Sequence, residues 1–314
     1  MTSSVATPCP AATGAPGAGL GLAILSAASF GTSGSFARAL SEAGWSPGAE
    51  VAARVSLAAL LLVIPGVLAL RGRLPALRRG GSAIMFYGVV AVAGCQLCYF
   101  NAIQHLSIGV ALLIEYLGTV LVVLWMWLRH GHAPRRLTII GTVLAIAGLV
   151  LVLDLTSAQH VDALGVAWAL GAALGLAAYY VLSGDGDTGV PPIAFASGGM
   201  IVGAVALFGL GAIGALPLHA TFGDVSLAGR AVAWWLPVLG LGLVAAAIAY
   251  VTGIGAARLL GAKLASFVGL TEVLFAVLFA WLFLGELPTA IQLAGGALIL
   301  VGVAVVRADE LAPG

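Results

Sequence analysis

The chain has 314 residues, of which 61% are hydrophobic and 8% charged, and its mean hydropathy is +1.14. Ordinary soluble domains carry about 25% charged residues, so this composition excludes a soluble globular protein. The formal net charge of +1 gives no basic surface of the kind that binds nucleic acid, and three cysteines give no disulfide framework.

The first eighteen residues are small and rich in proline and glycine, and they contain no lysine or arginine. A secretory signal needs a basic segment before its apolar core, so we predict a disordered tail over residues 1–18. At the other end, residues 308–314 are predicted to form a short C-terminal tail.

The rest of the chain is a succession of apolar stretches with short connections. A membrane-spanning helix needs about 20 mostly apolar residues. Ten stretches meet this length and predict an all-α integral membrane protein with ten transmembrane helices: 19–38, 48–70, 82–104, 107–128, 136–154, 163–183, 191–214, 233–256, 263–284 and 289–307. The longest connection, 215–232, is too short for a core of its own, so the function is expected within the helix bundle.

Lysine and arginine are distributed unevenly between alternate connections. With the N-terminus inside, the outer connections hold only Arg38 and Arg230. The inner side holds the others that flank the spans: Arg71, Arg73, Arg78, Arg79, Arg129, Arg135, Arg136, Arg258, Lys263 and Arg307. Short cytoplasmic loops are enriched in these residues, so both termini are predicted to be cytoplasmic.

The two halves of the chain resemble each other. Shifted by 154 positions, AIQHLSIGVALLIEYLGTVLVV (102–123) lies over AARLLGAKLASFVGLTEVLFAV (256–277), and His132 then falls opposite Glu286. A five-span unit is odd, so its second copy enters the membrane from the opposite face. This pattern predicts two inverted five-helix repeats with a substrate site between them, near the middle of the membrane. Chance similarity among helices rich in Leu, Ala and Gly is the alternative. The predicted repeats are residues 19–154 and 163–307.

Three ionisable residues lie inside predicted spans. Glu115 and Glu272 are near the centres of the fourth and ninth spans, and Arg54 lies in the second, one turn after Glu50. A charge at this depth costs about 2.5–3.5 kcal/mol on insertion scales, so such residues usually have a function. We expect the glutamates to contact a cationic group of a substrate or to carry a coupling proton. The structural alternative is a buried ion pair with Arg54.

Polar and aromatic residues supply further candidates for the site. Asn and Gln often hydrogen-bond between helices, so a purely structural role is an equal alternative for them. The predicted substrate-binding or coupling residues are, together with Glu115, Glu272 and Arg54, the following: Gln96, Tyr99, Asn101, Tyr116, Trp168 and Tyr250. Tyr179 and Tyr180 are candidate cavity walls.

Two motifs suggest other chemistry but lack its partners. Cys95-x-x-Cys98 has metal-binding spacing, yet zinc needs four ligands and no further Cys/His pattern follows. Gly184-Asp185-Gly186-Asp187 matches a string found in intramembrane aspartyl proteases, which need a second membrane aspartate. We therefore predict no metal, no cofactor and no catalytic residues.

Three segments of the sequence resemble those of a known family. TEVLFAVLFAWLFLGELP (271–288) and SPGAEVAARVSLAALLL (46–62) resemble the drug/metabolite transporter superfamily, and within it the EamA-type permeases. GVALLIEYLGTVLVV (109–123) resembles the corresponding helix of the threonine/homoserine exporters, with Thr119 in place of a proline. The resemblance implies an amino-acid or related metabolite exporter, with Glu115 near the substrate ammonium group. In a further departure, Val273 follows Glu272 where the family often has proline.

The leading hypothesis is a multi-pass secondary transporter of the cell (inner or plasma) membrane. It would export a small amphipathic molecule by alternating access, through proton coupling or facilitated exchange. Its expected partners are a small-molecule substrate, the lipid bilayer and protons, with no nucleic acid. A non-transporting membrane scaffold, which predicts a packed core around Glu115, and an intramembrane enzyme, which rests on Asp187, are the alternatives. Substrate identity, transport direction and oligomeric state stay open.

Overall fold

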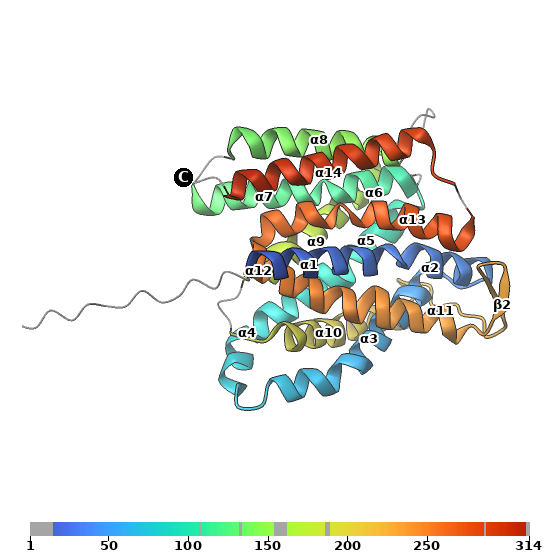
Figure 1. Ribbon diagram of the computed structural model, residues 1–314. Helices are drawn as coiled ribbons and strands as arrows, with labels where there is room; N and C mark the ends of the chain where they lie inside the picture. The colour runs from blue at the N-terminus through green and yellow to red at the C-terminus, as the bar shows by residue number, and fades with distance from the viewer. Residues whose placement is uncertain are drawn as a thin grey trace, which may run out of the picture.

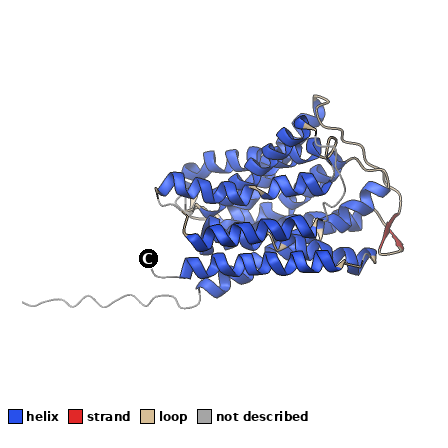
Figure 2. Cartoon of the chain, turned by 90° about the horizontal axis from the view of Figure 1, so that it is seen from above, coloured by secondary structure: helices blue, strands red, loops and turns tan. Residues whose placement is uncertain are grey.

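The computed structural model describes residues 15–106, 108–131, 134–153, 162–185, 189–285 and 287–311. Within these ranges the helices lie side by side in an elongated bundle (Figure 1). A two-stranded antiparallel hairpin of β1 (Val225–Leu227) and β2 (Arg230–Val232) lies at one end, and α14 ends at the other (Figures 1 and 2). We call these the hairpin end and the C-terminal end.

The helices divide between the two halves of the chain. Those of the first half are α1 (Ala15–Gly31), α2 (Ser33–Glu42), α3 (Pro47–Ala69), α4 (Leu74–Phe86), the π-helical turns η1 (Tyr87–Gly94), α5 (Cys95–Ala102), α6 (Ile108–Tyr116), α7 (Gly118–His130) and α8 (Arg136–Val152). Those of the second half are α9 (Ala163–Gly184), α10 (Pro192–Ala212), α11 (Trp235–Leu239), the π-helical turns η2 (Gly240–Ile248), α12 (Ala249–Gly269), α13 (Glu272–Leu284) and α14 (Ala290–Leu311).

The length and composition of the helices fit a membrane protein. Within the described ranges, eight helices or continuous runs of helix are long and apolar enough to cross a membrane. The helices α8 and α13 are equally apolar but shorter, at 17 and 13 residues. The structure therefore supplies eight long spans, and the ten-helix count stays a prediction.

Two predicted spans are broken where the sequence indicates continuous helices. The span predicted over 107–128 is divided at Leu117 into α6 and α7. The span predicted over 263–284 starts just after a kink at Gly261 within α12, and it is divided between Gly269, where α12 ends, and Glu272, where α13 begins. The chain turns at Leu270 and Thr271 between them. Such broken helices are tolerated at membrane depth where they line a cavity.

A second correction concerns the all-α prediction, which overlooked the hairpin in the long connection 215–232. The hairpin turn is made by Ala228 and Gly229, both with positive φ angles, of 53° and 72°. Strand 225–227 packs under Trp45 and Ala49 in a small apolar cluster. The hairpin therefore covers one end of the bundle and adds no core of its own.

The principal helix contacts join the two halves of the chain. Helix α1 packs on α12, α3 on α10, α8 on α14, and α9 on α5, α6 and α7. In the α8–α14 contact the two helix backbones approach each other closely at glycine residues. A Cβ atom added to Gly148 would lie 2.5 Å from the Gly295 carbonyl oxygen, and one added to Gly295 would lie 2.6 Å from that of Gly148. Small residues of this kind let helix backbones touch in a membrane.

Aromatic side chains gather at the hairpin end. The indole rings of Trp45 and Trp234 are stacked, with centroids 6.1 Å apart, and the Phe222 ring meets both edge-on. The Trp45 indole N–H donates to the Thr221 carbonyl oxygen at 2.7 Å. The loop between α2 and α3 is thereby joined to the second half of the chain.

Candidate functional site

A cavity of about 750 Å³ lies in the middle of the bundle and extends to the hairpin end. Its lining includes Val152 and Leu153 at the last turn of α8 and Gln292 at the first turn of α14. Leu287, which is 75% exposed, lies at its outer edge. A cavity of this size is typical of small-molecule sites in proteins.

Most of the predicted site residues line this one cavity. The predicted residues that line it are Arg54, Gln96, Tyr99, Glu115, Tyr116, Tyr250 and Glu272. They come from α3, α5, α6, α12 and α13, so the fold brings together side chains that are far apart in the sequence. The cavity walls Tyr179 and Tyr180 also lie where the sequence analysis expected them.

Two predicted residues lie elsewhere. The Asn101 side chain donates to the Leu97 carbonyl oxygen of its own helix at 2.8 Å and does not line the cavity. Trp168 packs against a separate apolar cluster that contains Ala102 and Ala169. The Asn101 amide is thus satisfied within α5, and the Trp168 ring packs between α9 and its neighbours. The prediction placed both side chains in the site, and the geometry does not.

Arg54 is held in place by contacts from both halves of the chain. Its guanidinium donates to the Ala245 carbonyl oxygen at 2.8 Å and to Ser33 Oγ at 3.3 Å, and lies 5.7 Å from the Phe30 ring centroid. No ion pair joins Arg54 to a carboxylate among the described residues. The structural alternative, an ion pair of Arg54 with one of the buried glutamates, is therefore not formed, and the positive charge faces the cavity.

The two central glutamates occupy opposite kinds of helix end. Glu115 is in the last turn of α6, and Glu272 is the first residue of α13. A helix N-terminus carries partial positive charge and a C-terminus partial negative charge. A carboxylate is thus stabilised by the helix end at Glu272, whereas at Glu115 the helix carbonyls add to the negative potential. An ammonium group is better placed beside Glu115.

Neither glutamate has a cationic partner within ion-pair distance in the described part of the chain. Glu115 Oε1 instead lies 3.4 Å from the Cys95 thiol, whose other acceptor is the Ala172 carbonyl oxygen at the same distance. Both side chains are only partly buried and line the cavity. These two carboxylates and the guanidinium of Arg54 are therefore available to a ligand in the cavity.

Several lining residues were not predicted as part of the site. Glu50 is 5% exposed, lines the cavity and accepts a hydrogen bond from Ser41 Oγ at 2.6 Å. Its position in the first turn of α3 looked like an ordinary helix start. Phe30, Phe100 and Gln292 also lie in the wall, and no sequence signal distinguished them.

The Cys95-x-x-Cys98 motif and the segment 184–187 are the two that suggested metal or protease chemistry. Cys95 and Cys98 are free thiols, and the described residues contain no group of three or more His, Cys, Asp or Glu side chains arranged to hold a metal ion. Asp185 follows the end of α9, but Asp187 lies outside the described residues, as do His132 and Glu286.

Comparison with known proteins identifies two regions of family similarity. The model of the EamA-like transporter family matches residues 17–154 and again 163–308. The threonine/homoserine exporter RhtA of Escherichia coli is 30% identical over 222 residues, which cover 69% of this chain and 68% of that protein. An uncharacterized transporter of Archaeoglobus fulgidus is 29% identical over 213 residues, covering 66% and 70%. The uncharacterized transporter YwfM of Bacillus subtilis is 28% identical over 233 residues, covering 72% and 73%.

The fold is also known from experiment. A crystal structure is similar over 95% of this chain and 99% of the other, with a TM-score of 0.72 and 22% sequence identity. The apolar helices and the family match together indicate a multi-pass membrane protein and a membrane transporter. The resemblance noted in the sequence is confirmed, and this chain belongs to the EamA-like transporter family.

Proposed function

We propose that this protein is a secondary transporter that exports small amphipathic metabolites such as amino acids across the inner or plasma membrane. The observation that carries the proposal is the central cavity, which presents carboxylates and a guanidinium within aromatic walls. The cavity has one group for each charge of a zwitterion: the substrate ammonium lies beside Glu115, and the substrate carboxylate lies at Arg54. Glu272 then interacts with a second substrate group or a coupling proton.

The transport cycle that we propose is alternating access of two inverted five-helix repeats, with ten spans in total. Three features of the second half recur in the first at a shift of about 154 positions. The break at Leu270 and Thr271 corresponds to that at Leu117, and η2 corresponds to η1. The contact of α1 with α12 also corresponds to that of α9 with α5. These correspondences support the two-repeat plan, and α8 and α13 then serve as short spans.

The proposed orientation places both termini and the C-terminal end of the bundle in the cytoplasm. The arginine-rich connections and the rule that cytoplasmic loops are basic support it. In this orientation the cavity extends from the middle of the membrane to the outer face. The alternative hypothesis, a scaffold without transport activity, predicted a packed core around Glu115. The cavity therefore favours a transporter.

Transport is tested by counterflow in proteoliposomes that contain the purified protein. The assay uses radiolabelled threonine first, followed by other amino acids and simple amines. We expect Glu115→Gln to reduce exchange at least tenfold, since the amide removes the charge that binds the ammonium. The matched control is Glu42→Gln, because Glu42 is an exposed acid paired with Arg38 and lies outside the cavity.

Each outcome of this assay has a distinct meaning. Exchange that is lost only in Glu115→Gln supports both the function and the role of Glu115. Equal exchange in both variants would leave a transporter in which Glu115 does not bind substrate. No exchange of any compound by the parent protein would contradict amino-acid export. Proton coupling is tested separately by imposing a pH gradient, which would have no effect on a facilitated exchanger.

A further inference from the structure

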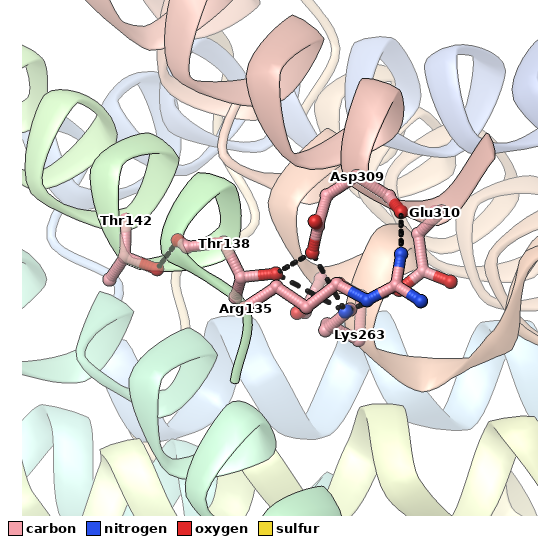
Figure 3. A network of polar contacts seen from close by, with 7 residues as sticks. Arg135, Thr138, Thr142, Lys263, Asp309 and Glu310 are labelled. Carbon is pink, nitrogen blue, oxygen red and sulfur yellow. Dashed lines mark hydrogen bonds and ion pairs between the residues drawn. The ribbon is translucent and has the colours of Figure 1, made fainter. Parts of the chain in front are cut away.

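A polar cluster lies at the C-terminal end of the bundle, away from the cavity. Its members come from the first turn of α8, the last part of α12 and the last turn of α14 (Figure 3). They are Arg135, Thr138, Lys263, Asp309 and Glu310, which we call the polar lock. None of these residues lines the cavity, so the proposed substrate site does not account for the polar lock.

Asp309 is the centre of the polar lock and is only 4% exposed. Its Oδ2 atom accepts a hydrogen bond from Thr138 Oγ1 at 2.5 Å and lies 3.9 Å from Lys263 Nζ. The Asp309 carbonyl oxygen accepts a hydrogen bond from Arg135 at 3.2 Å. A buried carboxylate is strongly unfavourable without such partners, so these contacts hold the three helices together.

Lys263 is the residue that joins the polar lock to α12. Its ammonium lies 2.5 Å from Glu310 Oε1 and donates to Thr138 Oγ1 at 3.3 Å (Figure 3). The Lys263 side chain is 23% exposed, so its ion pairs are partly shielded from water. Because it contacts α8 and α14 at once, Lys263 connects the second-half helix α12 to a residue of the first half.

The two sides of the polar lock differ in how firmly they are fixed. Helices α8 and α14 have their backbones in contact at Gly141 and Gly302, as well as at Gly148 and Gly295. Asp309, Glu310, Thr138 and Arg135 therefore belong to one rigid pair of helices. Lys263 belongs to another element, and its contacts are the ones that can open without separating that pair.

The segment that carries Lys263 is bounded by two interruptions of the helix. Gly261 has φ 79° and ψ 158°, which are non-helical angles that favour glycine, and Leu270 and Thr271 form the turn before α13. Residues 262–269 are thus a short helical piece. Lys263 lies near its start, and Glu272 of the cavity follows its end. The piece is a direct connection between the polar lock and the site.

We propose that the polar lock holds the C-terminal end closed while the cavity is open at the hairpin end, and that residues 262–269 transmit movement between Lys263 and Glu272. Opening the C-terminal end requires Lys263 to leave Asp309 and Glu310. A ligand that draws Glu272 toward the cavity centre shifts the same piece of helix and so changes the stability of the polar lock.

The test measures thiol labelling at the two ends of detergent-purified protein whose own cysteines are replaced by serine. Ser266→Cys reports the C-terminal end, because Ser266 is 1% exposed and lies on the 262–269 piece. Ala37→Cys reports the hairpin end, because Ala37 lines the cavity. The labelling reagent is a maleimide, and no substrate is needed. A failure of the amino-acid assay would therefore not affect this result.

Lys263→Gln and Glu310→Gln are combined with each reporter. We expect each to increase Ser266→Cys labelling about fivefold or more and to decrease Ala37→Cys labelling, as in a shift between two states. The double variant should differ little from Lys263→Gln alone, since that change already removes the ion pair with Glu310. Arg307→Gln is the matched control, a cation on α14 that is not part of the polar lock.

Two results would overturn the proposal. Unchanged labelling at both reporters would mean that the polar lock does not control the conformation. Increased labelling at position 266 without a decrease at position 37 would mean that the variants only loosen one end. Lys263→Arg retains the charge and is expected to keep the parent pattern. If it instead labels like Lys263→Gln, a loss of packing rather than of charge is responsible.

Discussion

The two ends of the bundle correspond in sequence but differ in charge. With the shift of 154 positions, Arg135 and Thr138 of the C-terminal end correspond to Thr289 and Gln292 of the hairpin end. Lys263 corresponds to Gly109. The C-terminal end carries a network of charged groups, whereas at the hairpin end Gln292 lines the cavity.

This difference indicates which properties come from the common helix plan and which come from single residues. The broken helices and the π-helical turns occur in both halves and create the space between them. Among the described residues, the network of Lys263, Asp309 and Glu310 belongs to the C-terminal end, and in our proposal it keeps that end closed. Changes of volume and of charge at each end test this division.

The closed end should tolerate no added volume. A Cβ atom on Gly302 would lie 2.7 Å from the Gly141 carbonyl oxygen and 2.8 Å from the Ala145 nitrogen. Gly302→Leu must therefore separate α8 from α14, and we expect a loss of about 3 kcal/mol in the free energy of unfolding. Thermal unfolding in detergent measures it. Gly21→Leu, where nothing lies within 4 Å of the added atom, should unfold like the parent.

The open end should tolerate added volume at the expense of transport. Ala280 lines the cavity. We expect Ala280→Trp to abolish substrate exchange, because the indole fills the path. The free energy of unfolding should change by less than about 0.5 kcal/mol, since no packed core is disturbed. Counterflow and thermal unfolding are measured on the same preparation. A variant that both transports normally and folds normally would contradict the proposed route.

The charge of Arg54 should act on the substrate and not on the conformation. We expect Arg54→Gln to increase the half-saturating concentration of an amino acid about tenfold, equivalent to about 1.4 kcal/mol of binding. The methyl ester of the same amino acid has no carboxylate and should be unaffected. Equal losses for the acid and the ester would show that Arg54 supports the cavity wall instead of binding the carboxylate.

The exposed ion pair at the hairpin end should contribute least. Arg38 and Glu42 lie 2.9 Å apart, with side chains that are 50% and 57% exposed. Pairs of this kind contribute little, so Glu42→Gln should change the free energy of unfolding by less than about 0.5 kcal/mol. Chemical denaturation of the two proteins measures the difference. A larger loss would mean that the hairpin end is held by charge as well.

Continuous helices were predictable from the sequence, and broken helices were not. The predicted spans 48–70, 163–183 and 191–214 lie within three residues of α3, α9 and α10 at each end. The breaks at Leu117 and at Leu270 and Thr271 contain no proline and no charged residue. Hydropathy therefore cannot detect them, because packing against the neighbouring half of the chain determines where the helix turns.

The charged part of the cavity was predictable, and its neutral part was predictable only in places. Glu115, Glu272 and Arg54 were identified because a charge inside an apolar span is costly. Asn101 was misplaced because its amide is satisfied within its own helix. Trp168 was misplaced because depth alone does not distinguish a cavity wall from a packed interior. The polar lock was not predicted, since its residues looked like ordinary charges at helix ends.

The stacked indoles of Trp45 and Trp234 have a practical consequence. They join the loop after α2 to the segment after the hairpin, so the two rings lie on parts of the chain from different halves. A movement of these two segments relative to each other would change their stacking and their contact with Phe222. The unlabelled protein thus contains its own optical reporter, and tryptophan emission can follow the movement of the hairpin end in real time.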